Sequence, residues 1–285
     1  NKEKELKLAI LNAKKFIKKT DIIKLYEALV LYNNNKFSDA KNRLETISFD
    51  KNDIKNEIIR STALAHCYDR TEDIKNAFKY FKKSNILYPK LKKINFFDKK
   101  RYLQSIRVRE KIFAQNKVKK WKSIESSKSD LAPIFLIGFP RSGTTLLDTI
   151  LSTLANVKVI EEKPLVKKLI DSLQKLPKGG LESLGSIKDQ ELEKIRKVYL
   201  DSLQFEIKGK NSANIYIDKL PLNIIHVGEI VRIFPNSKFI FSLRHPCDCV
   251  LSCFMQNFTL IDAMSNFLDI KDAAYLYDAV MKLWN

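Results

Sequence analysis

The sequence predicts helical hairpin repeats followed by an α/β domain with a mostly parallel sheet. Three observations support this fold class. Small residues recur at a fixed displacement within the first 90 residues, strand-length and helix-length apolar segments alternate after residue 131, and a glycine-containing loop joins the first such strand to a helix. We therefore divide the chain into a helical domain at residues 1–127 and an α/β domain at residues 128–285.

The helical repeats are indicated by two sets of residues that line up at a displacement of 37 positions. The first set is Ala28, Ala40, Leu44 and Ile47, and the second is Ala65, Ala77, Phe81 and Ser84. In a helical hairpin, small residues let two helices approach closely while larger ones fill the space around them. Two amphipathic hairpins without a shared repeat ancestry remain the alternative.

Tyr68 and Pro89 extend the pattern, because they stand where the tetratricopeptide repeat has an aromatic residue and a terminating proline. The segment resembles that family, whose period is about 34 residues and whose arrays need about three units. Residues 3–19 are therefore expected to be the second helix of an earlier unit. The basic residues 90–122 predict one or two connecting helices, and the polar residues 122–130 predict the domain boundary.

The α/β domain is predicted from alternating apolar segments. Strands are expected at residues 131–138, 157–160, 215–217 and 238–243, and helices at residues 144–154, 164–176, 187–207, 222–234 and 246–254. This alternation favours a parallel sheet with helices on both faces, and ligands then bind at the carboxyl ends of the strands.

The loop between the first strand and its helix carries the strongest chemical signal. Backbone amides at a helix N-terminus favour an anion such as phosphate. The candidate binding residues of this loop are Pro140, Arg141, Ser142, Gly143, Thr144 and Thr145, preceded by Gly138. Its two glycines are those of a P-loop, but Thr144 stands where an ATP-binding loop has Lys, which disfavours a kinase or nucleoside triphosphatase.

A second anion site is predicted at the end of the last strand. Arg244 ends that strand, and Ser252 follows eight residues later on a helix. A guanidinium matches the fork geometry of a phosphate, and a hydroxyl adds one more donor.

Together these motifs resemble the sulfotransferase family, and the helical repeats before them resemble bacterial tetratricopeptide-repeat-containing sulfotransferases. The resemblance implies a P-loop-like fold and 3′-phosphoadenosine 5′-phosphosulfate (PAPS) as the sulfuryl donor. The loop would bind the donor's 5′-phosphosulfate, and Arg244 with Ser252 its 3′-phosphate. No metal ligand set is expected, and the family's loop that closes over the donor is unmatched before Asn285, so part of the α/β domain is expected to be missing.

The catalytic residues implied by the resemblance are Glu162, Lys219 and Arg141. Lys219 follows the third strand, where the family places a Lys near the bridging oxygen of the donor. Glu162 closes the second strand 21 residues after Arg141, as in tyrosylprotein sulfotransferases, whose pattern is closest, so we expect it to be the base. Glu161 is the alternate base, and His226 is a weaker candidate.

The composition limits the partners that we expect. The formal charge of +19 favours anionic ligands, although Lys scattered through an Asn- and Ile-rich chain also reflects a biased genome. The four cysteines lack zinc-site spacing and predict reduced thiols, and no apolar run is long enough for a membrane span or signal peptide. We expect a cytoplasmic enzyme without nucleic-acid partners.

The acceptor hydroxyl is expected to belong to a protein tyrosine, a carbohydrate or a small alcohol. The repeat domain favours a peptide or protein, because stacked hairpins form a concave groove. The alternative to an enzyme is a non-catalytic repeat scaffold with a nucleotide-binding domain.

Overall fold

The computed structural model describes residues 2–16, 20–91, 97–119, 121, 132–176, 180–207 and 215–284. The chain forms two compact units. The helical unit comprises Asn1–Asp98 and Phe254–Ile270, and the α/β unit comprises Lys99–Cys253 and Lys271–Asn285. Neither unit is one continuous stretch of chain.

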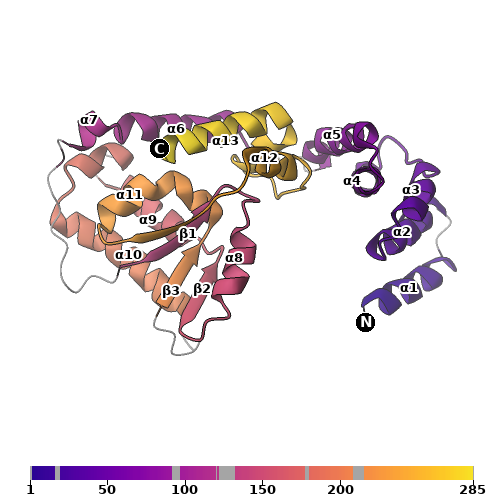
Figure 1. Ribbon diagram of the computed structural model, residues 1–285, viewed down its shortest axis with the longest axis horizontal. Helices are drawn as coiled ribbons and strands as arrows, with labels where there is room; N and C mark the ends of the chain where they lie inside the picture. The colour runs from indigo at the N-terminus through magenta and orange to yellow at the C-terminus, as the bar shows by residue number, and fades with distance from the viewer. Residues whose placement is uncertain are drawn as a thin grey trace. The chain divides into compact units, whose positions relative to one another are not determined.

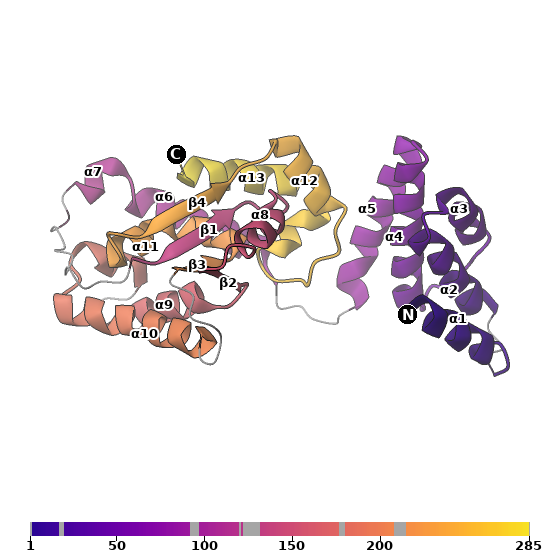
Figure 2. The same ribbon diagram turned by 60° about the horizontal axis from the view of Figure 1, so that its bottom comes forward.

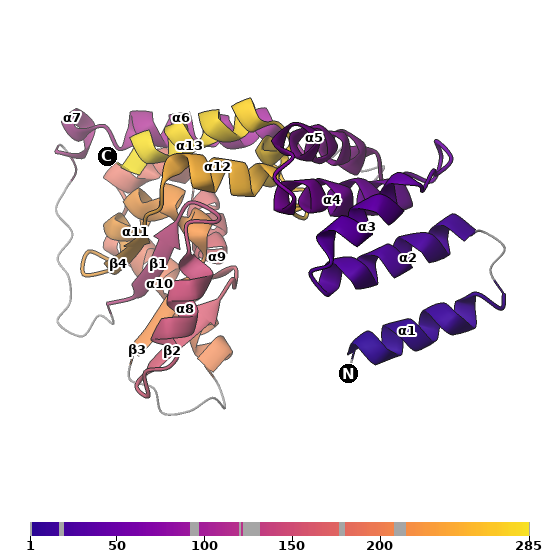
Figure 3. The same cartoon turned by 45° about the vertical axis from the view of Figure 1, so that its right-hand side comes forward.

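The helical unit is built from successive helices (Figure 3). The helices are α1 (Lys2–Ala13), α2 (Thr20–Asn33), α3 (Phe37–Glu45), α4 (Ile54–Arg70) and α5 (Ile74–Leu91). Asn35 and Glu72 take positive φ angles of 58° and 62° in the turns after α2 and α4, which lets the chain reverse within a few residues. Asp53 caps α4 by accepting a hydrogen bond from the Asn56 backbone at 3.4 Å. The segments predicted to be hairpins thus form helix pairs.

The core of the helical unit contains the residues that recur in the sequence. Ala28, Ala40, Leu44, Ile47, Ala65, Ala77 and Phe81 are all buried in one cluster, and Ser84 is buried as well. Small residues at the helix contacts therefore do what their spacing predicts, which is to let the helices pack closely. Membership of the tetratricopeptide family stays a prediction.

The segment Phe254–Ile270 completes the helical unit, although it lies far away in the sequence. The ring of Phe254 stacks on Phe78 with ring centroids 5.3 Å apart, and the Asn85 side-chain amide donates to the Phe254 carbonyl at 2.9 Å. Asn257 donates to the Thr62 hydroxyl at 3.0 Å. The segment includes the short 3₁₀ helix η3 (Met264–Leu268).

The α/β unit contains a four-stranded sheet in the order β2-β3-β1-β4, and every neighbouring pair is parallel. The strands are β1 (Ile134–Gly138), β2 (Val157–Glu161), β3 (Ile215–Lys219) and β4 (Lys238–Ser242) (Figure 2). Because all four strands run in the same direction, their carboxyl ends lie at one edge. This confirms the predicted α/β domain with a parallel sheet.

The two faces of the sheet are covered by different helices. Leu147 and Leu151 of α8 (Thr144–Leu151) pack against Leu136 and Ile217 on one face. On the other face, Phe135 contacts Tyr199 of α10 with ring centroids 5.8 Å apart. Side chains alternate between faces along each strand, so the near-continuous apolar run of β1 reflects burial on both sides.

The remaining helices complete the unit (Figure 1). They are α6 (Lys99–Ile112), α7 (Gln115–Val118), α9 (Leu165–Gln174), η1 (Gly180–Gly185), α10 (Asp189–Ile207), η2 (Pro221–His226), α11 (Val227–Ile233), α12 (Pro246–Phe254) and α13 (Ile270–Trp284). Helix α13 lies beside α6, where Arg107 packs over the Tyr275 ring at 5.9 Å. Among the described residues, no helix is long and apolar enough to cross a membrane.

The predicted boundary between residues 127 and 128 lies outside the described residues. Helices α6 and α7, which we expected on the helical side of that boundary, belong to the α/β unit. The helix expected at residues 222–234 is divided into η2 and α11, and Pro221 stands at the first position of η2. Proline tolerates a first turn, where its missing N–H is not needed.

Candidate active site

The loop after β1 is shaped by two residues with positive φ angles and one glycine that has no room for a side chain. A Cβ on Gly138 would lie 2.7 Å from both the Ser142 hydroxyl and the Ser242 carbonyl oxygen. Arg141 has a φ of 69°, and Gly143, directly before α8, has a φ of 101°. This conformation turns the chain from the strand edge into the N-terminus of α8, where unpaired amides favour an anion.

Ser142 gives independent evidence that the loop fits an anion. Its side chain is 6% exposed, and its hydroxyl has no hydrogen-bond partner within the described parts of the chain. A buried hydroxyl without a partner costs about 1–3 kcal/mol. The carbonyl of Ser142 does have a donor, since the Ser242 hydroxyl lies 3.0 Å away. The orphaned Ser142 hydroxyl can therefore donate to a phosphate oxygen. Thr144 is buried directly after this cradle, and Thr145 is exposed.

The structure brings Arg141, Ser252 and Arg244 together, although they come from the loop, from α12 and from the end of β4. The Arg141 Nε donates to the Ser252 hydroxyl at 2.9 Å, and an Arg244 amino group approaches the Arg141 carbonyl at 3.5 Å. The Arg244 Nε also pairs with Asp248 at 3.3 Å. Three predicted anion ligands thus form one group. Helix α12 is fixed to the loop by Cys253, whose buried thiol lies 3.4 Å from the Pro140 carbonyl.

A second group of predicted residues, which we call the strand-edge cluster, consists of Glu161, Glu162 and Lys219. Glu161 and Lys219 are the last residues of β2 and β3 and are paired in register. The Lys219 ammonium lies 2.9 Å from the Glu161 carboxylate and 3.1 Å from the Glu162 carboxylate. The Lys219 side chain is fully buried, whereas each Glu side chain is 59% exposed. All four strands are parallel, and both this cluster and the arginine group lie at or just after the carboxyl ends of strands. The two groups are therefore at the same edge of the sheet.

The backbone of Glu162 explains how two consecutive carboxylates reach one ammonium. Successive residues of an extended strand point to opposite faces. Glu162 instead takes a φ of 50°, and its N–H donates to the Lys219 carbonyl at 2.8 Å. A left-handed conformation is costly for a residue with a Cβ and clusters at functional sites.

The charge of Lys219 depends on these carboxylates. Burial alone would lower the pKa of Lys219, but the hydrogen bonds and charges of Glu161 and Glu162 outweigh burial and raise its pKa above the ordinary value. Lys219 is therefore a cation at neutral pH despite its burial. Next to it in β3, burial raises the pKa of Asp218 to about 7, although a hydrogen bond from Tyr199 at 3.2 Å lowers it somewhat.

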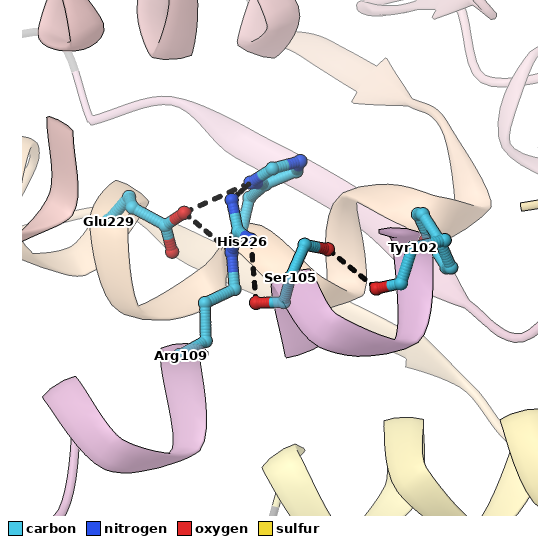
Figure 4. A network of polar contacts seen from close by, with 5 residues as sticks. All are labelled: Tyr102, Ser105, Arg109, His226 and Glu229. Carbon is cyan, nitrogen blue, oxygen red and sulfur yellow. Dashed lines mark hydrogen bonds and ion pairs between the residues drawn. The ribbon is translucent and has the colours of Figure 1, made fainter. Parts of the chain in front are cut away.

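His226, the weaker candidate for the base, is part of a different group, which we call the helix cluster: Arg109, His226 and Glu229 (Figure 4). The Arg109 Nε donates to Glu229 at 2.8 Å, and the His226 Nδ1 lies 3.0 Å from both the Glu229 carboxylate and an Arg109 amino group. Burial alone would raise the pKa of Glu229, but the hydrogen bond and charge of His226 and the charge of Arg109 lower it. His226 is thus engaged in an ion-pair network away from the strand-edge cluster.

Two polar residues near the site were not expected from the sequence. Asp248, in the first turn of α12, pairs with Arg244, which lies two residues before that helix begins. Asp218 gives no signal in the sequence, since only the packing of α10 on the sheet buries it. In the described part of the chain, no group of three or more His, Cys, Asp or Glu side chains could hold a metal ion.

Comparison with protein families decides the class of this site. The family model described as the sulfotransferase family matches residues 133–285, which is more than half of the chain. The chain belongs to the sulfotransferase family.

The chain is also similar to parts of individual proteins. The chain is 29% identical over 119 residues to protein-tyrosine sulfotransferase 1 of Danio rerio, covering 40% of this chain and 33% of the relative. It is 30% identical over 115 residues to protein-tyrosine sulfotransferase 2 of Gallus gallus, covering 39% of this chain and 30% of the relative. An uncharacterized protein of Aquifex aeolicus is 31% identical over 164 residues, covering 54% of this chain and 21% of the relative. The matches thus span about a fifth to a third of these relatives.

Proposed function

We propose that this sulfotransferase-family chain transfers a sulfuryl group from PAPS to an acceptor hydroxyl. The observation that carries the proposal is the assembly of the anion-binding loop, the Arg141, Arg244 and Ser252 group, and the strand-edge cluster at one edge of the sheet. The 5′-phosphosulfate would bind at the loop, where the orphaned hydroxyl of Ser142 and the amides of α8 are donors. The 3′-phosphate would bind Arg244 and Ser252.

The contact between Arg141 and Ser252 refines these roles. The Arg141 Nε donates a hydrogen bond to the Ser252 hydroxyl at 2.9 Å, so the two side chains are within reach of the same ligand. In the proposed complex, the Arg141 guanidinium turns toward the sulfuryl oxygens, and the Ser252 hydroxyl is released to the 3′-phosphate. Arg141 is the residue that links the two ends of the donor site.

In the proposed reaction, the acceptor oxygen forms a bond to sulfur while the bond between sulfur and the bridging oxygen breaks. The electron pair of that bond stays on the bridging oxygen, and the product is adenosine 3′,5′-bisphosphate. Glu162 takes the proton of the acceptor hydroxyl, and the Lys219 ammonium neutralises the charge that develops on the bridging oxygen. The buried, charged state of Lys219 supports this role.

For the acceptor, we propose a tyrosine in a peptide or protein. Two of the relatives that are similar to this chain are protein-tyrosine sulfotransferases. The Glu side chains are more than half exposed, so a hydroxyl carried by a larger molecule can approach them. We also propose that the helical unit binds part of such an acceptor. Removal of that binding should raise the KM for a protein acceptor and leave the KM for a short tyrosine peptide unchanged.

A ligand titration followed by a transfer assay tests the proposed function. The protein is titrated with adenosine 3′,5′-bisphosphate and, separately, with ATP and magnesium, and then incubated with labelled PAPS and a tyrosine peptide. We expect preference for the bisphosphate and label on the peptide. Preference for ATP would favour a kinase or nucleoside triphosphatase, and bisphosphate binding without transfer to any hydroxyl acceptor would favour a non-catalytic scaffold.

A further inference from the structure

The strand-edge cluster contains more negative charge than Lys219 needs. One carboxylate neutralises one ammonium, yet Glu161 and Glu162 both lie within 3.1 Å of the Lys219 nitrogen. A site that binds a polyanionic donor is weakened by each additional carboxylate. The second carboxylate therefore calls for a role of its own.

The two carboxylates are held in different ways. Glu161 is the last residue of β2 and is paired in register with Lys219, so the strand ladder itself keeps its carboxylate beside the ammonium. Glu162 lies beyond the strand, in a left-handed conformation with a φ of 50°. Glu161 is thus fixed by regular structure, whereas Glu162 reaches Lys219 only through a special backbone conformation.

The number of N–H donors on the Lys219 ammonium is compatible with separate roles for Glu161 and Glu162. A lysine ammonium has about three N–H donors. Glu161 and Glu162 accept two hydrogen bonds from Lys219. If Glu162 turns to the acceptor hydroxyl and Glu161 stays, the remaining donors can face the bridging oxygen without the buried cation losing its counter-charge. A buried cation without a counter-charge tends to lose its proton.

We propose that Glu161 is a positioning residue, which holds the Lys219 ammonium charged and directed at the leaving oxygen while Glu162 accepts the proton of the acceptor. This assignment of Glu161 rests on the sulfuryl transfer proposed above. It separates the two glutamates by function: Glu161 acts through Lys219, and Glu162 acts on the acceptor.

The test compares Glu161→Gln with Glu162→Gln and with the control Glu193→Gln. Glutamine keeps an acceptor oxygen and removes the charge. Glu193 is a matched control because its side chain is 63% exposed and pairs at 2.7 Å with Arg196, a buried cation of α10. The measurements are kcat and KM for PAPS against pH, and the pH midpoint of the Lys219 ¹³Cε resonance in lysine-labelled protein, assigned by its absence from Lys219→Arg.

For Glu161→Gln we expect kcat to fall about 10- to 100-fold, the effect of losing one charge-assisted hydrogen bond, while KM for PAPS stays the same or falls. The alkaline limb of kcat and the Lys219 midpoint both move to lower pH, because Glu161 raises the pKa of Lys219. Glu162→Gln lowers kcat about 10³- to 10⁴-fold, and Glu193→Gln leaves kcat, KM and the Lys219 midpoint unchanged. A loss of fold would also change KM for PAPS, so a lower kcat together with a lower Lys219 midpoint at an unchanged or lower KM identifies positioning.

Two results would overturn the role of Glu161. One is full kcat with an unmoved alkaline limb in Glu161→Gln, and the other is turnover in Glu162→Gln together with its loss in Glu161→Gln. If the wild-type protein transfers no sulfuryl group, the proposed function fails. The Lys219 midpoint then still decides whether Glu161 maintains the ammonium, because that measurement needs no substrate.

Discussion

The strand-edge cluster and the helix cluster both pair a buried cation with carboxylate, but water reaches them differently. In the strand-edge cluster, buried Lys219 meets two carboxylates that are each 59% exposed. In the helix cluster, the Arg109 and Glu229 side chains are 6% and 0% exposed. The helix cluster connects α6 to α11 through an ion pair whose side chains are almost fully buried, whereas both carboxylates of the strand-edge cluster are open to solvent. The two clusters therefore differ in the exposure of their carboxylates, and not in the burial of their cations.

In the strand-edge cluster, Glu162→Gln should have the largest effect of all the variants. It should lower kcat about 10³- to 10⁴-fold because no group then takes the acceptor proton, while the affinity for adenosine 3′,5′-bisphosphate is retained. Single-turnover transfer and calorimetric titration measure the two effects. An equal loss of binding would mean that Glu162 holds the donor instead of acting as the base.

In the helix cluster, Glu229→Gln should lower the stability of the protein and leave ligand binding unchanged. It leaves the Arg109 charge buried without its partner, and we expect the free energy of unfolding to fall by about 3 kcal/mol with unchanged bisphosphate affinity. Urea denaturation measures the loss. The double variant Arg109→Met with Glu229→Met removes both charges and should be more stable than Glu229→Gln. If the double variant is less stable than the wild-type protein, the ion pair contributes more than its desolvation costs.

Arg244→Ala extends the comparison to the other exposed ion pair at the sheet edge. Loss of the guanidinium should weaken bisphosphate binding about 10- to 100-fold. Arg43→Ala is the matched control, because Arg43 lies in the helical unit and is 44% exposed against 50% for Arg244. Equal effects of the two variants would show that net positive charge, and not a phosphate contact, determines the affinity.

Asp218→Asn should have the smallest effect and tests a carboxyl without a cation. Burial raises the pKa of Asp218 from 3.8 to about 7, so the unfolded chain releases this proton first and the free energy of unfolding falls as pH rises through that range. In Asp218→Asn, the free energy of unfolding should fall by about 1–3 kcal/mol less over the same pH range than in the wild-type protein. Urea denaturation at pH values across the range measures it, and parallel curves for both proteins would refute the shift.

The positions of the candidate site residues near strand ends could be predicted from local sequence, while their roles stay a prediction. Lys219 and Glu162 follow short apolar strands, and Arg244 with Ser252 is separated by two helical turns. The sequence did not indicate that Glu162 leaves the extended conformation, since a Glu has no preference for positive φ. The reach of both carboxylates to Lys219 was therefore visible only in the structure.

The unpredicted parts of the fold depend on contacts between distant segments. The helix cluster joins α6 to α11 across more than 100 residues, and no local pattern marks Arg109 or Glu229 as partners. The buried residues of the helical unit were predictable from their spacing, but the contribution of Phe254–Ile270 to that unit was not. Apolar periodicity identifies a face that will be buried without naming the segment that covers it.

Because Phe254–Ile270 belongs to the helical unit, the two units cannot be produced separately by cutting the chain at one position. Phe254 and Phe267 are each 2% exposed, and the partners that cover Phe254 include Phe78 and Asn85 of α5. A shortened protein that begins at Lys99 would keep this segment and lose those partners, exposing apolar rings to water. Joining or separating the units at one genetic breakpoint would leave one of them unfinished. The helical unit and the α/β unit therefore cannot be separated by a single cut of the chain without dividing one of them.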